Sequence, residues 1–412
     1  MTGALHLFEA YGIELEYMIV ARDSLAVLPV SDELLRAVTG SYAGDYEAGP
    51  VAWSNELVLH VIELKTNGPT PSLAGWSERF SADVARIDAL LAPMGGMLLP
   101  TAAHPTMDPL TEARLWPHEN SPIYDAYDRI FGCSGHGWSN LQSCHVNLPF
   151  SGDVEFGRLH AAIRAVLPLL PGLAASSPML DGRLTGSLDS RIEVYRRNQE
   201  RVPSIVGALV PEPVFTERDY REQILQRIYG DIAPLDPQGI LQYEFLNSRG
   251  AIARFDRSAI EIRLLDVQET PRADLAIALL IAQTLRALDA GRWSDPATLR
   301  ALRTEPLAVL LRRCCTEGEA AVIEERELLA VFGHTGPRCS AGELWQHIAG
   351  AVLPGMPADC ADLRETAEQI LAAGPLARRM LRALGTAPDA ERITAVYREL
   401  AACLVEGRLF GA

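Results

Sequence analysis

The feature that most constrains this chain is the segment YGIELEYMIV, residues 11–20, in which two carboxylates interrupt an apolar run. Ile13 and Leu15 are typical of a buried strand. Glu14 and Glu16 are two residues apart, so both side chains point to one face of that strand. Like charges on a rigid support repel one another, and burial raises the cost unless a cation lies between them. The segment therefore predicts a strand with an apolar face toward a core and a charged face toward a site.

Another predicted strand carries carboxylates within an apolar sequence. The expected strands are 11–20, 56–66, 141–148, 241–247, 251–255 and 259–267. Glu56 and Glu63 frame the second strand, and at seven residues apart a regular strand would place them on opposite faces. A turn or a bulge would bring them back to one side. The sequence leaves open whether these two carboxylates act together.

The third and the last strands each place two polar residues on one face. His145 and Asn147 alternate with apolar neighbours, and so do Glu261 and Arg263. Each face by itself could be merely solvated, with Glu261 and Arg263 as a simple ion pair and His145 as a hydrogen-bonded core histidine. Taken together, carboxylates and one imidazole on rigid strands favour a site for Mg²⁺ or Mn²⁺ over a zinc site.

The order of the elements favours an α+β fold with a twisted, mostly antiparallel sheet. Its polar and apolar strand faces alternate, and Val20 is followed by ARDSLAV rather than by a glycine-rich phosphate turn. Apolar spacing predicts a helix over 76–92 and another over 153–176, which Pro168 and Pro171 should kink or split.

The texture of the chain changes near residue 272. Beyond this point it is rich in Ala, Leu and Arg with helical spacing, and prolines punctuate it. We therefore expect a catalytic α+β part, 1–270, and a C-terminal helical part, 271–412, packed on it.

Composition excludes several classes of protein. Lys65 is the single lysine among 412 residues, so neither a P-loop nor a protein kinase can be built, and pyridoxal-phosphate chemistry is disfavoured. The formal net charge of −16 argues against nucleic acid or an anionic membrane as a partner. The longest apolar run, LAIALLIA, is far shorter than the roughly 20 residues of a membrane helix.

The cysteines and the N-terminus predict a cytoplasmic protein. The seven cysteines form no CxxC pair and are expected to be reduced thiols. The opening residues, MTGALHLFEAYGIE, lack the basic and apolar regions of a signal peptide. The sequence does not determine the oligomeric state, and an oligomer is compatible with it.

Six motifs occur in an order that resembles the glutamate–cysteine ligase type 2 family. They are GIELE, ELVLHVIELKTN, TAAHP, CHVNLPF, AASSPMLDG with a later SR, and IEIRLLDVQETP. The resemblance spans about residues 11 to 271. Members of that family are ATP-dependent carboxylate–amine ligases related to glutamine synthetase. The resemblance implies a half-barrel sheet with helices outside. It also implies that ATP phosphorylates the side-chain carboxylate of an amino acid, typically glutamate, and that an amine, often that of cysteine, attacks the acyl phosphate.

The resemblance further implies roles for residues at matching positions. The metal ligands would be Glu14, Glu16, Glu56, Glu63 and Glu261. Near ATP, Glu261, Arg263 and His145 would bind the nucleotide, and Arg263 and His145 would act on the transferred phosphate. For the amino-acid substrate, Arg191 matches best, then Arg201, with Asn147 also on the substrate side. These roles suit the chemistry, because phosphoryl transfer between anions needs metal ions and guanidinium groups to neutralise charge.

Some features depart from the family pattern or allow other interpretations. This chain reads CHVNLP where relatives often carry a second His or an Asp, so the substrate side, including the acceptor amine, stays open. His104 either lines the site or shapes a turn, Cys144 is expected to be a packed thiol, and Lys65 a surface residue. A metal-dependent hydrolase using the same carboxylates is disfavoured because no HExxH-type pair occurs. A non-catalytic, nucleotide-binding scaffold is disfavoured because every acidic position is retained.

Overall fold

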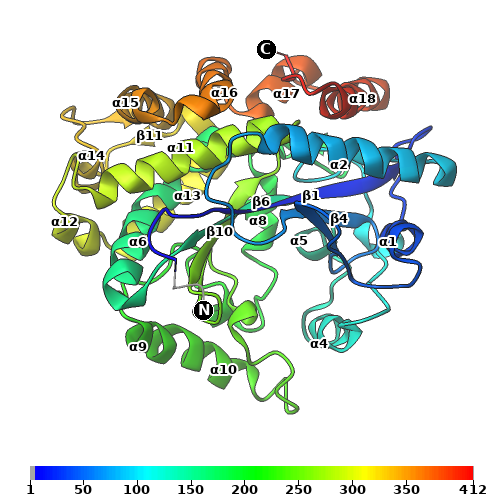
Figure 1. The fold of residues 1–412 in the computed structure, drawn as a ribbon, viewed down its shortest axis with the longest axis horizontal. Coiled ribbons are helices and arrows are strands. Elements are labelled where there is room, and N and C mark those ends of the chain that lie inside the picture. The colour runs from blue at the N-terminus through cyan, green and yellow to red at the C-terminus, as the bar shows by residue number, and fades with distance from the viewer. Residues whose placement is uncertain (1–4, 412) are drawn as a thin grey trace.

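The computed structural model describes residues 5–411 and is built around an open, twisted sheet of eight strands (Figure 1). The strand order is β2-β3-β4-β1-β6-β10-β9, with β5 paired to β1, and the pairings are antiparallel. The strands are β1 (Gly12–Ala21), β2 (Asp45–Tyr46), β3 (Val51–Asn55), β4 (Val61–Thr66), β5 (Gly96–Leu99), β6 (Ser143–Pro149), β9 (Ala251–Arg254) and β10 (Ala259–Asp266). The predicted fold class, a mainly antiparallel sheet with helices outside, is confirmed.

The two faces of this sheet differ as the alternation in β1 predicts. Ile13, Leu15 and Tyr17 are fully buried on the face that packs against helices. The main helices on this face are α2 (Trp76–Leu91), α6 (Gly152–Val166) and α11 (Pro271–Asp289). In Figure 1, α2 and α11 lie above β1, whereas other helices lie below the sheet, beyond its opposite face. Those helices are α4 (Ser121–Phe131), α9 (Glu217–Tyr220) and α10 (Gln226–Ile232).

Shorter elements complete the first part of the chain. They are α1 (Ser31–Thr39), α3 (Pro109–Glu112), α5 (His136–Ser139), α7 (Pro171–Ala174), α8 (Ser190–Tyr195) and the ribbon of β7 (Met179–Leu180) with β8 (Arg183–Leu184). The helix expected over 153–176 is split as predicted, because a 3₁₀ turn at Leu167–Leu169 separates α6 from α7 and each break carries a proline.

The strand expected over 241–247 is wrong. This segment contains a 3₁₀ turn at Glu244–Leu246. Its backbone bonds are local: the Tyr243 N–H donates to the carbonyl of Leu241, and the Leu246 N–H donates to that of Tyr243. Short-range turns therefore satisfy the backbone groups that a strand would pair with a neighbour.

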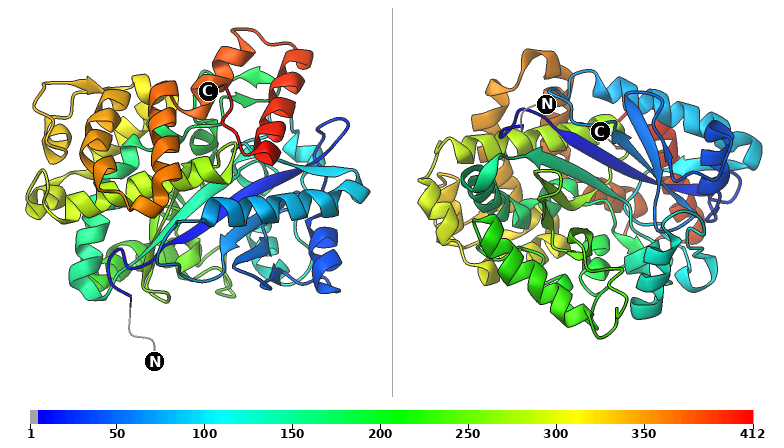
Figure 2. Two further views of the ribbon diagram at one scale, coloured as in Figure 1. Left: turned by 45° about the horizontal axis from the view of Figure 1, so that its top comes forward. Right: turned by 60° about the horizontal axis from the view of Figure 1, so that its bottom comes forward.

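Helices dominate the chain from Pro271 onward. After α11 come α12 (Pro296–Ala301), α13 (Thr304–Glu317), α14 (Arg326–Val331), α15 (Ala341–Val352), α16 (Ala361–Ala373), α17 (Leu376–Leu384) and α18 (Ala390–Glu406), with a ribbon of β11 (Val322–Ile323) and β12 (Cys339–Ser340). They lie together on one side of the sheet (Figure 2). Leu279 of α11 and Ile13 of β1 belong to one continuous hydrophobic core. A division of the chain near residue 270 stays a prediction.

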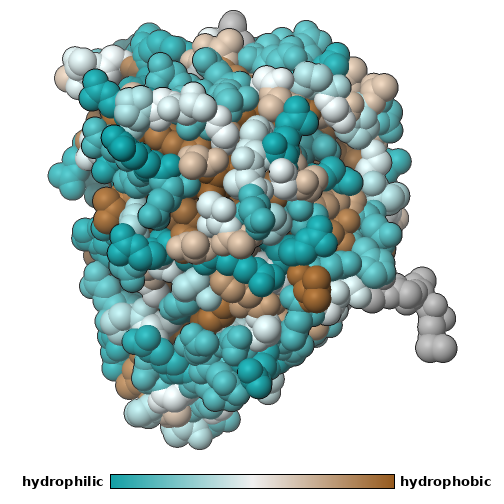
Figure 3. Space-filling model, turned by 90° about the vertical axis from the view of Figure 1, so that its left-hand side faces the viewer, coloured by the Kyte–Doolittle hydropathy of each residue, from teal (hydrophilic) through white to brown (hydrophobic). Residues whose placement is uncertain are grey.

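Among residues 5–411, the surface carries no large apolar area on the face drawn in Figure 3, and the cysteines are unpaired, as expected from their spacing. On the face drawn in Figure 3, hydrophobic residues are scattered between hydrophilic ones. All seven cysteines are buried and unpaired. Within residues 5–411, the helices are too short or too polar to cross a membrane.

A buried ion pair fastens the C-terminal segment to the end of β10. Glu269 and Arg379 have side chains that are at most 1% exposed, and they form a salt bridge. Arg379 also donates to the carbonyl of Phe410 over 2.7 Å, and the Phe410 N–H donates to Glu269 over 3.2 Å. Loss of either charge would leave the other without a partner in the core.

We expect Arg379→Met to lower the free energy of unfolding by about 3–5 kcal/mol, the usual cost of breaking a buried pair on one side. The neighbouring Arg378 is a matched control, because its salt bridge with Glu319 is about one-third exposed. Arg378→Met should cost at most about 1 kcal/mol. Urea denaturation followed by circular dichroism measures both, and equal losses would contradict a special role for the buried pair.

Candidate active site

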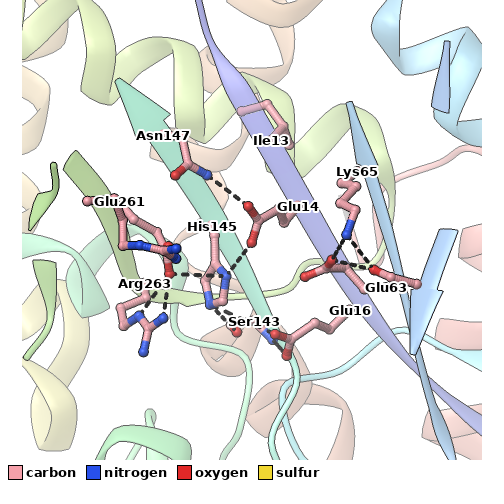
Figure 4. Close-up of polar contacts among 12 residues, drawn as sticks. Ile13, Glu14, Glu16, Glu63, Lys65, Ser143, His145, Asn147, Glu261 and Arg263 are labelled. Carbon is pink, nitrogen blue, oxygen red and sulfur yellow. Dashed lines mark hydrogen bonds and ion pairs between the residues drawn. The ribbon is translucent and has the colours of Figure 1, made fainter. Parts of the chain in front are cut away.

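Polar side chains from four adjacent strands meet on the face of the sheet opposite the helical core (Figure 4). Strand register sorts them into three rows that cross the sheet. The first row holds Gly12, Asn147 and Glu261; the second holds Lys65, Glu14, His145 and Arg263; and the third holds Glu63, Glu16, Ser143 and Asp266. The alternation predicted from the sequence therefore places these groups on one surface, and antiparallel pairing brings the rows together.

Two groups within these rows have ligand atoms within 4.8 Å of one another. One group comprises Glu14, Glu63 and His145, and the other comprises Glu16, Glu56 and Glu63. Because Glu63 belongs to both, two cations held by these groups would share its carboxylate. Carboxylate oxygens with one imidazole nitrogen suit hard divalent cations. The donor set therefore fits the Mg²⁺ or Mn²⁺ that the sequence predicts.

Glu56 reaches this cluster from a loop and not from a strand. β3 ends at Asn55 and β4 begins at Val61, so the strand predicted over 56–66 is wrong in its first five residues. The connection turns the chain between the two antiparallel strands and returns Glu56 to the side of Glu63. Glu56 and Glu63 therefore lie on the same side of the sheet, because a turn separates them.

Hydrogen bonds hold the carboxylates in defined orientations. Glu14 has one oxygen 2.9 Å from His145 Nδ1, and its other oxygen accepts from Asn147 Nδ2 over 3.0 Å. The Ser143 N–H donates to Glu16 over 2.7 Å. These contacts leave the cluster rigid before any ligand arrives, as a binding site requires.

Lys65 is a cavity residue, and the surface position expected for it is wrong. Its ammonium lies 3.1 Å from a Glu63 oxygen and donates to Ser54 Oγ over 2.8 Å, while Ser54 donates to the same Glu63 oxygen over 2.7 Å. The strand alternation of β4 directs Lys65 to the charged face, where the carboxylates attract it.

The crowding of negative charge changes the protonation of the cluster. Burial and the nearby Glu14 charge raise the pKa of Glu63 to about 7. Burial and the charges of Glu16 and Glu63 raise the pKa of Glu56 well above its ordinary value. Burial opposes charge on His145 as well, but its bond to Glu14 and the surrounding carboxylates raise its pKa to about 9. Without a metal ion, the cluster therefore binds protons in its place.

Glu14 is the exception among the buried carboxylates. Burial would raise its pKa, but the hydrogen bond and the charge of His145 lower the pKa to about 2, with help from Lys65 and Arg263. Glu14 therefore carries a full negative charge at every physiological pH. Glu14 therefore stays ionised, whereas the neighbouring Glu56 and Glu63 bind protons more readily than ordinary carboxylates.

A bulge in β10 turns Arg263 toward the second row. Ile262 pairs with Val146 and Leu265 pairs with Cys144, so Arg263 and Leu264 together stand opposite a single residue. The Arg263 guanidinium binds Glu261 Oε1 through two nitrogens, at 3.0 and 2.5 Å. The predicted pairing of these two residues is present, and both line the cavity described next.

The rows form the floor of a cavity of about 900 Å³. A volume of this size is enough for a nucleotide or an amino acid with room to spare. The predicted site residues that line it are Glu14, Glu16, Glu56, Glu63, His145, Asn147, Arg191, Glu261 and Arg263. Arg201 is not among the lining residues, and its guanidinium donates to the carbonyl of Ile130.

His104 and Cys144 are structural. His104 is buried, with Nε2 2.7 Å from the carbonyl oxygen of Leu25 and Nδ1 accepting from the Thr106 N–H over 3.2 Å. It shapes a turn, which is one of the two roles weighed from the sequence. Cys144 is buried on the core face of β6, as expected for a packed thiol.

Sequence reasoning missed Asp266, which orients Arg191. Arg191 Nε donates to Asp266 Oδ1 over 2.5 Å, and the other Asp266 oxygen accepts from the Ser176 N–H over 2.7 Å and from Ser177 Oγ over 2.8 Å. Asp266 lies at an odd spacing from Arg263, so regular alternation would send it to the core face. The bulge moves Asp266 into register with Ser143, on the site side.

Comparison with known proteins gives a consistent result. Residues 10–399 match the family described as glutamate-cysteine ligase family 2. An uncharacterized protein of Archaeoglobus fulgidus is 38% identical over 261 residues, which cover 63% of this chain and 70% of that protein.

Two solved structures share the fold. A glutamate–cysteine ligase of Francisella tularensis in complex with AMP superposes with a TM-score of 0.58 at 15% identity, covering 96% of this chain and 89% of that one. A bifunctional glutathione synthetase of Pasteurella multocida superposes with a TM-score of 0.60 at 13% identity, covering 97% of this chain and 53% of that one. At these identities the likeness concerns the fold.

We expect Mg²⁺ to raise the melting temperature more at pH 8 than at pH 6. The folded pKa of Glu63 is about 7 and that of His145 about 9, both above their ordinary values of 4.5 and 6.5. These raised pKa values stabilise the metal-free protein at low pH, and this stabilisation is lost as the pH rises through about 7 and then 9. A cation replaces those protons, so it binds more tightly as they leave.

Differential scanning fluorimetry with and without Mg²⁺ measures the effect across this range of pH. Glu63→Gln should reduce both the Mg²⁺-induced gain and its dependence on pH, because Glu63 belongs to both ligand groups. Glu78→Gln, on an exposed position of α2, is the control. A gain that is equal at the two pH values would contradict the assignment of these groups as ligands.

Proposed function

The chain belongs to the glutamate–cysteine ligase family 2, a family of ATP-dependent carboxylate–amine ligases, and we propose that it joins an acidic amino acid such as glutamate to an amine. In the proposed reaction, a side-chain carboxylate oxygen attacks the γ-phosphorus of ATP and ADP leaves. The amine nitrogen then attacks the acyl carbon of the acyl phosphate. The carbon–nitrogen bond forms, inorganic phosphate leaves with the electrons of the carbon–oxygen bond, and the nitrogen loses a proton.

The shared carboxylate cluster is the observation that carries this proposal. Phosphoryl transfer between two anions needs cations at the point of transfer, and little covalent work from the protein. Glu14, Glu16, Glu56, Glu63 and Glu261 are the proposed metal ligands, with His145 beside them. Bound Mg²⁺ would supply charge neutralisation between the phosphates and the carboxylate. The protein's own part is to hold these oxygens rigidly on strands around one cavity.

Arg263 is proposed to neutralise the transferred phosphoryl group. Its guanidinium is fixed by Glu261 and lies in the row of Glu14 and His145, next to one of the two ligand groups. A guanidinium can bind two phosphate oxygens in parallel. His145, whose pKa of about 9 keeps it protonated at neutral pH in the metal-free protein, would add positive charge there until a metal ion displaces the proton.

Arg191 is proposed to hold the α-carboxylate of the acidic amino acid. Asp266 occupies its Nε, and its two terminal nitrogens make only long contacts, 3.4 Å each, to the carbonyl of Arg263. These terminal nitrogens therefore keep donor capacity for a carboxylate in the cavity that Arg191 lines. Asn147, which donates to Glu14 and lines the cavity, is proposed to contact the amino-acid substrate.

One experiment tests the reaction without knowledge of the acceptor. Hydroxylamine is a small nucleophile that captures acyl phosphates, so we expect ATP, Mg²⁺, glutamate and hydroxylamine to yield a glutamyl hydroxamate and ADP. Glu14→Gln and Glu261→Gln should each lower the rate at least about a hundredfold, as loss of a group that stabilises transition-state charge commonly does. Both variants should keep the far-ultraviolet circular dichroism of the wild type, and Glu78→Gln should keep its activity.

The absence of hydroxamate with glutamate and with other acidic amino acids, while ATP still binds, would refute the proposed reaction. Near-normal rates in either glutamine variant would refute the metal assignment while leaving the reaction in place.

A second prediction concerns Arg191. Arg191→Ala should raise KM for the acidic amino acid roughly 10- to 100-fold, because a hydrogen bond to a charged group contributes about 1.5–3 kcal/mol. KM for ATP should change far less. Arg196→Ala is the matched control from the same segment, since its side chain is about one-third exposed and pairs with Glu193. Initial rates in the hydroxamate assay separate the two KM values, and an unchanged KM for the amino acid would contradict the assignment.

A further inference from the structure

The two ends of the active-site cavity differ in chemistry. Beyond the first row, at the end marked by Gly12, the lining includes Arg254 and Arg257, with Arg254 paired across the sheet to Ala259. On the side of Glu56, where Asn55 donates both to the Tyr124 hydroxyl and to the Glu56 carbonyl, the lining includes several aromatic rings. The metal-ligand groups lie between the two ends. A substrate that reacts at the centre therefore extends toward one end or the other.

The aromatic end is formed by four side chains that we call the aromatic wall. They are Tyr124 and Tyr127 of α4, Trp138 of α5 and Tyr195 of α8, and each lines the cavity and is half-buried. The rings of Tyr127 and Trp138 have centroids 5.2 Å apart with an interplanar angle of 50°. Phe131 backs both rings, at 6.2 and 5.8 Å. The wall is thus supported from behind and presents ring surface to the cavity.

A contact fixes the wall beside the metal-ligand groups. Asn55 donates through Nδ2 to the Tyr124 hydroxyl over 3.0 Å and to the carbonyl of Glu56, also over 3.0 Å. Glu56 has a ligand atom within 4.8 Å of those of Glu16 and Glu63. The aromatic wall therefore begins next to the point where the acyl group would be activated. An acceptor whose amine attacks there would place the rest of its molecule in contact with these rings.

Each cation that lines the cavity already has a partner or a proposed role, including Arg191 and Arg263, which lie beside Tyr195 of the wall. The described residues that line the cavity include five Lys or Arg side chains, namely Lys65, Arg191, Arg254, Arg257 and Arg263. Arg254 and Arg257 belong to the opposite end, and Lys65 is bound to Glu63 and Ser54. With Arg263 proposed for phosphate, Arg191 is left as the cation for a carboxylate. Arg191 is proposed to bind the α-carboxylate of the acidic substrate. An amino-acid acceptor would bring a second α-carboxylate, and no cation among the described lining residues would be left to pair with it.

From this balance we propose that the acceptor is an amine without a carboxylate, and that its body is aromatic. The inference rests on the proposed ligase function and specifies its second substrate. Flat rings pack against the aromatic wall with offset or edge contacts. A protonated amine is attracted by the faces of the rings. A carboxylate on the same molecule would find no uncommitted guanidinium among the described residues beside the wall and would lose its hydration without compensation.

Matched pairs of amines test this inference. Each pair differs by one carboxylate: phenethylamine with phenylalanine, tyramine with tyrosine, and cysteamine with cysteine. With ATP, Mg²⁺ and glutamate, ADP release should show kcat/KM at least about tenfold higher for the carboxylate-free member of each aromatic pair, because a buried charge without a partner is costly. Among the carboxylate-free amines, the aromatic ones should exceed cysteamine.

Substitution of the wall provides a second readout. Trp138→Ala should raise KM for phenethylamine roughly five- to tenfold, because ring contact is lost. KM for ATP should stay unchanged. The control is Tyr42→Ala, because Tyr42 is 44% exposed on the surface and does not line the cavity. Equal effects of Trp138→Ala on the two KM values would indicate a general disturbance of the site and would count against the wall as an acceptor surface.

The outcomes separate this inference from its premise. Hydroxamate formation together with a preference for cysteine, phenylalanine or tyrosine over the matched amines would overturn the inference and leave the ligase function intact. Failure of hydroxamate formation would remove the ligase function, and the inference with it. Hydroxamate formation together with a preference for phenethylamine or tyramine supports both.

Discussion

Repulsion among carboxylates on one face of a β-sheet is the constraint on which the rest of this structure depends. Glu14, Glu16 and Glu63 are neighbours across β1 and β4 and cannot move apart, because the opposite faces of both strands are locked into the core. In the metal-free protein, this repulsion is reduced by protonation of Glu56 and Glu63 and by the positive charges of His145 and Lys65. Divalent cations would neutralise the same carboxylates, so the arrangement suits a ligand that carries them.

The supporting structure serves to keep these groups in place. Helices α2, α6 and α11 cover the apolar face, so the strands cannot shift register without exposing the core. The bulge in β10 allows Arg263 and Asp266 to face the same side although their spacing is odd. Asp266 in turn orients Arg191. Rigidity on one face of the sheet thus becomes preorganisation on the other.

Charged and aromatic groups line different parts of the cavity above the sheet. Anionic groups of a nucleotide and an acidic amino acid would meet metal ions and guanidinium groups near the centre and at the end of Arg254. The side of Glu56 offers aromatic surface, and the guanidinium groups beside it already have partners and proposed roles. This division links the proposed reaction to the proposed acceptor, because each substrate is expected where its charge is balanced and its apolar surface is covered.

The order of residues within each strand specifies which side chains that strand presents to either face. Alternation is local, so the order of residues alone pairs Glu14 with Glu16, His145 with Asn147, and Glu261 with Arg263. The packing of the whole chain sets which of these faces meet. It returned Glu56 to the cluster through a turn, brought Asp266 to the site through a bulge, left Arg201 outside the cavity, and built the aromatic wall from three separate helices. Register, bulges and loop paths depend on packing between distant segments, and one segment's pattern does not encode them.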